Sequence, residues 1–224
     1  PLEFQPGERW KYGVSADILA AVVEKASGLK YGEFLKKEFF EPLGMKDTGF
    51  FVPGEKLDRL AVTYEQTDGE IKEYRENSLG IRFAMDVPPA YEAGGAGLVS
   101  TIDDYSRFAA MLLNKGNFHG KQILKPGTVE YMTSHRLTGC QQDWFDKWWE
   151  MNGYSYGNLM RVMTDSWKAP FAASEGEYGW DGWLGCYFAN LPKENMTILM
   201  MMQKKDAGTF DLTRKLRNVM LLGM

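Results

Sequence analysis

One serine in the chain is followed three residues later by a lysine, in Ser27-Gly28-Leu29-Lys30, a spacing that can support nucleophilic chemistry. A serine hydroxyl is a weak nucleophile until a neighbouring base takes its proton. The pair can react only if both side chains reach one pocket, with the serine in the first turn of a buried helix. Here Gly28 is expected to end one helix and Lys30 to precede the next. We therefore reject Ser27 as the nucleophile.

Two further patterns suggest chemistry but fit their surroundings better as structure. The GGAG run at residues 94–97 has the composition of a phosphate-binding loop, but it lacks a following Lys-Ser or Lys-Thr pair and no clear strand precedes it. A tight turn explains it better. Asp103 and Asp104 follow Thr101 at the predicted start of a helix, where carboxylates interact favourably with the helix dipole. We interpret both as helix N-terminal acids rather than as a metal or general-acid pair.

The composition is typical of a globular chain. Its 224 residues are 44% hydrophobic and 14% aromatic, which is enough for a packed core. The net charge of −4 is spread without long runs, which argues against nucleic acid as a partner. Apolar stretches are shorter than the ~20 residues of a membrane helix, and no signal-peptide pattern opens the chain. We expect no cofactor, metal site or disulfide framework from the few thiols and imidazoles, which are Cys140, Cys186, His119 and His135.

The elements that must position any site begin with two predicted helices. The first is capped near Ser15 and ends at Gly28, and the second covers residues 31–40 and is stopped by the Pro-Leu-Gly triplet at 42–44. The apolar positions of the first helix follow a 3.6-residue period: Ile18, Leu19, Val22, Val23 and Ala26. This spacing predicts an amphipathic helical hairpin.

The middle of the chain is less regular. Residues 51–90 are polar and contain prolines, so we predict loops with a hairpin turn at the TDGE sequence of residues 67–70. Helices are predicted from Thr101 to about residue 115 and from Pro126 to about residue 134.

The last third changes to strand-like sequence. We predict adjacent antiparallel strands over residues 154–163, 183–189 and 197–203, followed by a covering helix over 210–222. The strand at 197–203 is apolar at consecutive positions, which is typical of a central strand covered on both faces. The simplest organisation is one domain, residues 1–224, with a helical lobe at about 1–150 and the sheet with its helix at about 151–224.

The order of these segments is similar to that of the β-lactamase-related serine hydrolases, which include class C β-lactamases, D-alanyl-D-alanine carboxypeptidases and esterases of the same fold. The resemblance covers nearly the whole chain, and its most specific segments are residues 6–19, 40–49, 94–108 and 179–185. It implies an α+β fold of the β-lactamase/transpeptidase type, with an antiparallel sheet packed against a helical lobe.

The resemblance also assigns site residues. In that family a Ser-x-x-Lys motif supplies the nucleophile and an amine, a Tyr-x-Asn or related motif supplies a phenol, and a Lys-Thr-Gly, His-x-Gly or Trp-x-Gly motif lies beside them on an edge strand. Tyr12 then corresponds to the base or proton shuttle. The residues implied for the oxyanion and the substrate are Trp180, Asp181, Gly182 and Trp183. The main-chain N–H of Trp183 would be one oxyanion donor, and Gly182 would leave room for the substrate.

The resemblance further implies that the N-terminal part of the domain is missing, because the chain lacks a segment matching the catalytic Ser-x-x-Lys. That absence would remove the nucleophile, the lysine that helps Tyr12 to lose its proton, and the second oxyanion donor. We therefore expect the isolated chain to be inactive and its full-length parent to form an acyl-enzyme on a small ester, amide or β-lactam. Val14 in place of an amide and Trp180 in place of a basic residue favour the esterase branch.

Several alternatives stay open at this point. The same departures from the motif would suit a non-catalytic, penicillin-binding-like module that binds peptidoglycan-type or protein ligands. The expected partners are a small acyl substrate and either the missing N-terminal segment or a second copy of the chain, without nucleic acid or metal. Trp144, Trp148 and Trp149 would either line a groove or pack as core. The expected source is bacterial, and the compartment is open between periplasm or exterior and cytoplasm.

Overall fold

The computed structural model describes residues 2–148, 151–207 and 209–223. Its helices are α1 (Ser15–Ser27), α2 (Tyr31–Leu35), α3 (Glu41–Leu43), α4 (Ile102–Leu113), α5 (Pro126–Thr133), α6 (Cys140–Asp146) and α7 (Thr209–Leu222), with a π-helix over Lys36–Phe40 and 3-10 helices over Gly54–Arg59 and Ser166–Lys168. Its strands are β1 (Tyr64–Thr67), β2 (Glu70–Glu73), β3 (Asn117–Phe118), β4 (Lys121–Gln122), β5 (Tyr154–Tyr156), β6 (Arg161–Met163), β7 (Tyr178–Asp181), β8 (Tyr187–Leu191) and β9 (Met196–Met200). Within the described ranges, none of the helices is both long and apolar enough to cross a bilayer.

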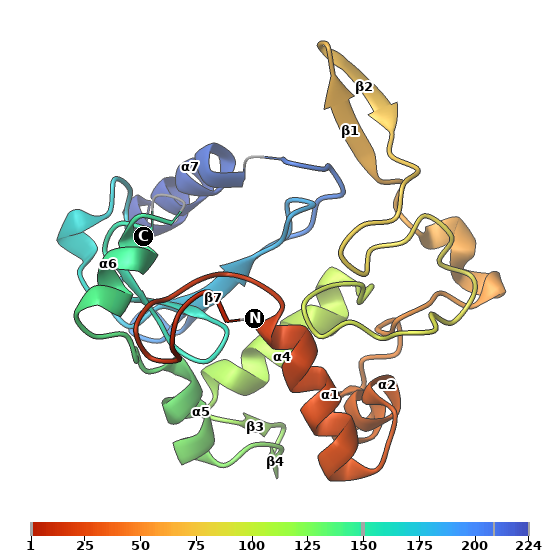
Figure 1. Ribbon diagram of the computed structural model, residues 1–224, viewed down its shortest axis with the longest axis horizontal. Coiled ribbons are helices and arrows are strands. Elements are labelled where there is room, and N and C mark those ends of the chain that lie inside the picture. The colour runs from red at the N-terminus through yellow and green to blue at the C-terminus, as the bar shows by residue number, and fades with distance from the viewer. Residues whose placement is uncertain (1, 149–150, 208, 224) are drawn as a thin grey trace.

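The main sheet is an antiparallel meander of five strands in the order β5-β6-β7-β8-β9. Phe188 and Leu199 belong to the cluster that includes α4, whereas their neighbours Ala189 and Ile198 pack with residues of α7. Side chains alternate between the faces of a strand, so the sheet is a layer between two helices. Figure 1 shows α7 and α4 on different sides of the sheet strands. This arrangement confirms the predicted α+β fold with an antiparallel sheet.

The strand predictions need four corrections. Residues 154–163 form the hairpin of β5 and β6 rather than one strand, and residues 183–186 form a turn before β8. The predicted site strand, β7, is the third strand of five and therefore not an edge strand. The strand β8 is buried along its whole length, as is the shorter β6, while β9 is the last strand in the order of the described sheet. The consecutive apolar residues of β9 arise because both of its faces are covered.

The first helices begin and end near the predicted residues but pack differently. Gly28 ends α1 in the left-handed conformation, with φ of 72°. The second helix continues as π-helix and α3 through Pro42 and ends at Gly44, with φ of 68°, so the proline does not stop it. Pro42 occupies the first turn of α3, where a missing N–H is tolerated. The expected buried face of α1 is largely exposed, with Ile18 at 62% and Val22 at 54%.

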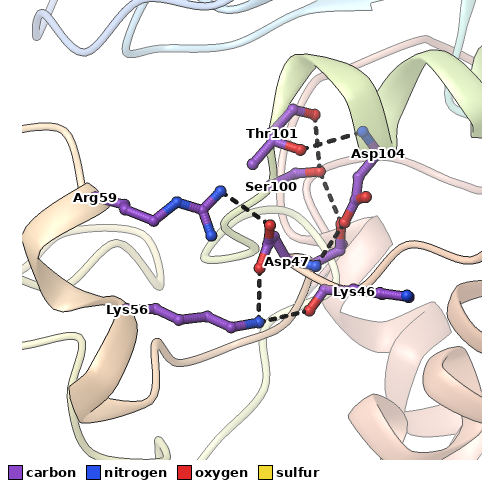
Figure 2. A network of polar contacts seen from close by, with 8 residues as sticks. Lys46, Asp47, Lys56, Arg59, Ser100, Thr101 and Asp104 are labelled. Atoms are coloured by element: carbon purple, nitrogen blue, oxygen red, sulfur yellow. Dashed lines mark hydrogen bonds and ion pairs between the residues drawn. The ribbon is translucent and has the colours of Figure 1, made fainter.

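The start of α4 is fixed by hydrogen bonds that tie it to the loop after α3. Thr101 caps the helix by accepting a hydrogen bond from Asp104 N (3.1 Å), as predicted. The buried Asp104 carboxylate then accepts from Asp47 N (2.7 Å) and from the Thr48 hydroxyl (2.9 Å). Figure 2 shows Asp104 and Asp47 side by side, with the Asp47 carboxylate bound by the side chains of Lys56 and Arg59. Asp104 is therefore a link between two segments as well as a helix N-terminal acid.

The predicted hairpin turn is present between β1 and β2. Thr67 pairs with Glu70, and Asp68 and Gly69 both have positive φ, as a type I′ turn requires. Figure 1 shows this hairpin projecting from the body of the molecule. The base of the hairpin is joined to the segment after β9, because Tyr64 N donates to Gln203 O and Lys205 N donates to Tyr64 O.

Candidate functional site

A large cleft of about 1880 Å³ brings the predicted site residues together. Its walls come from α1, the loops between residues 57 and 100, and the strands β7 to β9. Ligand pockets usually measure roughly 300–1,000 Å³, so this cleft is larger than a small acyl substrate needs. Its lining includes all five residues that the sequence nominated, which are Tyr12, Trp180, Asp181, Gly182 and Trp183.

Tyr12 belongs to a group of three nearly parallel rings, Tyr12, Trp148 and Trp180, which we call the aromatic wall. The ring centroids of Tyr12 and Trp148 are 4.9 Å apart, and each lies 5.7 Å from that of Trp180. The interplanar angles are 23°, 16° and 11°. Tyr12 is still 48% exposed. The wall thus places a solvent-accessible phenol directly beside the predicted substrate-binding strand.

The segment that carries Tyr12 is anchored by Trp10. The Trp10 ring is buried and makes an edge contact with Phe145 at 4.8 Å, while it also contacts Tyr156 at 5.3 Å. Burial, with a further contribution from Tyr12, raises the pKa of Tyr156 to about 12, so its phenol is neutral. The sequence analysis did not single out Trp10 or Tyr156. The available signal for Trp10 was the pair of aromatic residues on either side of Lys11, which is typical of a segment anchored by packed rings.

The predicted oxyanion donor lies in a tight turn after β7. Gly182 N donates to Cys186 O (2.7 Å), and Gly185 N donates to Gly182 O (2.9 Å). The indole of Trp183 is held separately, through its Nε1 donating to Asp206 Oδ1 at 2.5 Å. In the part of the chain that the structure describes, the main-chain N–H of Trp183 makes no hydrogen bond. That N–H is thus available to an oxyanion.

Gly182 and Asp181 have structural surroundings that refine their predicted roles. A Cβ added at Gly182 would lie 3.3 Å from Cys186 Cβ, which is tighter than ordinary contact, so the glycine allows the turn to close. The Asp181 carboxylate lies on the other face of β7, where Oδ1 is 3.2 Å from Arg161 Nη1. Burial raises the pKa of the Asp181 carboxyl, and the Arg161 guanidinium opposes this shift. The side chain of Asp181 therefore faces a buried cation rather than a substrate.

Ser27 and the glycine-rich run at residues 94–97, which we rejected as a nucleophile and a phosphate loop, have structural roles. Ser27 is exposed at the end of α1, where its hydroxyl accepts from Leu29 N (3.2 Å), and it does not line the cleft. A Cβ at Gly94 would lie 2.1 Å from Ala16 O, so the glycine-rich run packs directly on α1. Gly95 N faces the carboxylate of Asp17 at 3.4 Å, an acidic neighbour that would repel a phosphate.

The tryptophan patch serves both of the roles that were left open. Trp148 lines the cleft as part of the aromatic wall and also contacts the buried Trp10 ring at 5.0 Å. Trp144 is 44% exposed and packs beneath the guanidinium of Arg9 at 4.9 Å. Trp149 lies outside the described residues.

Comparisons with known proteins identify the family of the chain. A family model described as Beta-lactamase matches residues 1–219. Esterase EstB of Burkholderia gladioli is 30% identical over 198 residues, covering 83% of this chain and 47% of EstB. A putative D-alanyl-D-alanine carboxypeptidase of Escherichia coli K12 is 28% identical over 225 residues, covering 94% and 49%.

The fold is also shared with solved structures. Simvastatin synthase (LovD) from Aspergillus terreus, in its LovD6 mutant form, superposes with a TM-score of 0.84 at 21% identity, covering 100% of this chain and 57% of the other. The chain spans about half the length of the curated relatives it matches. Its relatives include proteins named as esterase and carboxypeptidase, and the match to the family model extends over almost all of its residues. The chain therefore belongs to the beta-lactamase family of serine-hydrolase-like proteins.

Proposed function

We propose that this chain is part of a serine hydrolase that forms an acyl-enzyme on small esters with apolar acyl groups. The observation that carries the proposal is that Tyr12 and Trp183 line the same cleft and that, among the described residues, the main-chain N–H of Trp183 makes no hydrogen bond. In the proposed reaction a serine hydroxyl attacks the acyl carbon and gives its proton to the Tyr12 oxygen, while Tyr12 passes its own proton to the amine of the missing lysine. The Trp183 N–H donates to the developing oxyanion. The alkoxide of the ester then leaves with a proton returned by the same shuttle.

Esters are favoured over carboxylate-bearing substrates because of the wall beside the oxyanion donor. The position that is basic in peptidoglycan-directed motifs is occupied by the indole of Trp180, which is stacked in the aromatic wall. An apolar acyl chain gains by burial against such rings, whereas a carboxylate gains no ionic partner from them. The esterase relative supports this choice of substrate class.

The nucleophile and its lysine are proposed to come from a segment outside this chain. Ser27 is exposed and lies away from the cleft, so it cannot take that role. The isolated chain then has a base and one oxyanion donor but no attacking group. We propose that it binds no acyl group covalently and has no family-type turnover.

The test compares the full-length protein with this chain. Both are treated with a fluorophosphonate probe and examined by intact mass, and both are assayed with p-nitrophenyl acetate, p-nitrophenyl butyrate and nitrocefin. We expect labelling and ester turnover by the full-length protein alone, with butyrate preferred to nitrocefin. The proposal fails if the full-length protein is neither labelled nor active, or if this chain shows turnover that disappears in Ser27→Ala.

A non-catalytic binding module is the competing hypothesis. It is favoured by the replacement of the motif amide by Val14 and of the basic residue by Trp180. Adding equilibrium dialysis to the labelling experiment separates the two functions, because a binding module would retain a peptidoglycan-type ligand without any covalent labelling of the full-length protein.

A further inference from the structure

A buried charged pair lies directly behind the predicted oxyanion turn. Arg161 in β6 and Asp181 at the end of β7 approach to 3.2 Å, and their side chains are only 2% and 8% exposed. Trp180 pairs with Phe188 and Asp181 pairs with Tyr187, so alternate residues of β7 point to opposite faces. The pair of Arg161 and Asp181 therefore lies on the face of the sheet opposite to the aromatic wall. Asp181 is two residues before Trp183 in the chain.

The side chain of Arg161 extends from β6 past β7 and reaches β8. Its register partner in β7 is Gly179, where an added Cβ would lie 1.9 Å from Phe188 O. Arg161 Nη2 donates to that same carbonyl oxygen at 3.2 Å. The guanidinium also lies 4.9 Å from the centroid of the Tyr187 ring. One side chain thus holds β6, β7 and β8 together at the point where β7 leads into the turn.

We propose that Arg161 and Asp181 are positioning residues that hold the end of β7 so that the Trp183 N–H is aimed into the cleft. This inference rests on the proposed function for its catalytic consequence. Its physical basis is that, among the described residues, two backbone hydrogen bonds close the turn after Asp181, from Gly182 N and Gly185 N, while Lys204 N donates to Leu184 O from the segment after β9. The direction of an N–H at such a turn depends on how firmly the strand before it is fixed. Oxyanion stabilisation depends steeply on that direction.

A second buried pair in the same layer provides a matched control. Glu177 accepts hydrogen bonds from the Tyr154 hydroxyl (2.5 Å) and from Arg217, and it is fully buried. It precedes β7, at the opposite end of the strand from the turn. Glu177→Gln and Asp181→Asn therefore both leave a buried arginine without its carboxylate, but only Asp181→Asn acts next to Trp183.

The first measurement is made on this chain by amide hydrogen exchange. We expect Asp181→Asn to speed exchange at Gly182 and Gly185 by at least about tenfold relative to the β8 amides, which report global opening. We expect Glu177→Gln to change the exchange rates of the turn amides and of the β8 amides by the same factor. Equal behaviour of the two variants would show that the pair does not control the turn, and the inference would then be wrong.

The second measurement is made on the full-length protein with a p-nitrophenyl ester. We expect Asp181→Asn to lower kcat by about 10- to 100-fold with KM within about twofold, because the donor is misaimed but the aromatic wall is intact. Glu177→Gln should retain the wild-type kcat below its unfolding temperature. If Asp181→Asn does not fold, Arg161→Lys keeps a cation opposite Asp181 and loses the bond to Phe188 O, and it should show the same loss of kcat in milder form.

The outcomes separate the two proposals. If the wild-type full-length protein turns over the ester but Asp181→Asn and Glu177→Gln have equal kcat values, the proposed function stands and the positioning inference fails. If the wild type has no turnover, the proposed function and the catalytic consequence fail together. The exchange experiment then still decides whether Arg161 and Asp181 control the turn.

Discussion

Replacing Asp104 with alanine should destabilise the chain far more than the same change at its neighbour Asp103. Both carboxylates lie in the first turn of α4, but Asp103 is exposed and Asp104 is 5% exposed. Asp104 alone accepts from Asp47 N and from the Thr48 hydroxyl, as Figure 2 shows for its contact with Asp47. The two substitutions therefore remove the same charge from the same helix end and differ in the link to the loop.

The magnitude follows from the hydrogen bonds that are lost. A hydrogen bond to a charged group contributes about 1.5–3 kcal/mol. The two hydrogen bonds and the helix-dipole interaction together give about 3–5 kcal/mol for Asp104→Ala, after allowing for the partial exposure of the donors to water. Asp103→Ala loses only the dipole interaction, about 0.5 kcal/mol. Asp104→Asn keeps one acceptor oxygen and should fall between them.

The assay is urea unfolding of the chain, followed by far-ultraviolet circular dichroism and by tryptophan fluorescence. Coincident transitions would justify a two-state free energy of unfolding for each variant. If Asp104→Ala and Asp103→Ala lower that free energy equally, Asp104 acts only through the helix dipole. The proposed link between α4 and the loop at residues 44–49 would then be wrong.

Three further outcomes are expected. Tyr12→Phe in the full-length protein should lower kcat by about 10²–10⁴-fold while KM stays similar, because the aromatic wall keeps its third ring and only the hydroxyl that moves the proton is lost. An unchanged kcat would remove Tyr12 from the mechanism. Hydrogen bonds from Arg59 and Lys56 lower the pKa of Asp47 from 3.8 to about 2. The ionised Asp47 carboxylate therefore contributes to the free energy of unfolding above pH 4, and this contribution is lost as the pH falls toward 2. With solvent screening the contribution amounts to about 1 kcal/mol. The difference in unfolding free energy between wild type and Asp47→Asn should therefore shrink by about half between pH 6 and pH 3, and a difference that grows toward acid would contradict the shift. Asn190→Leu should cost about 2–4 kcal/mol in thermal or urea unfolding, because the buried amide donates to Ala109 O and accepts from the Thr197 hydroxyl. A cost no greater than that of Asn158→Leu, in the exposed turn between β5 and β6, would show these bonds to be dispensable.

Local chemistry was enough to predict the elements whose ends depend on neighbouring residues. The Asp68-Gly69 pair predicts the hairpin of β1 and β2 because both positions need positive φ, which they have. Thr101 predicts the start of α4 because its hydroxyl can accept from the N–H three residues later, at Asp104. In both cases the residues that determine the structure are within a few positions of one another.

The sheet was harder to predict from the sequence. The turn between β7 and β8 contains Trp183 and Leu184, which look like strand residues until the hydrogen bonds around Gly182 and Gly185 are known. The lone charge of Arg161 within an apolar stretch was the available signal of a buried ion pair, but its partner Asp181 is in another strand. Pairing between strands depends on contacts far apart in the chain, and the local pattern does not contain them.

For the candidate site, the sequence by itself determined which residue types were present, and the resemblance of its motifs nominated Tyr12 and the strand at 180–183. Only the tertiary structure decided that Tyr12 stacks with Trp148 and Trp180 and that the Asp181 carboxylate faces Arg161. It also decided that the Trp183 N–H makes no hydrogen bond to any residue that the structure describes. The physical reason is that the direction of a side chain or an N–H is set by packing between distant segments. Propensity and periodicity act over a few residues, whereas the cleft is formed by residues from both ends of the chain.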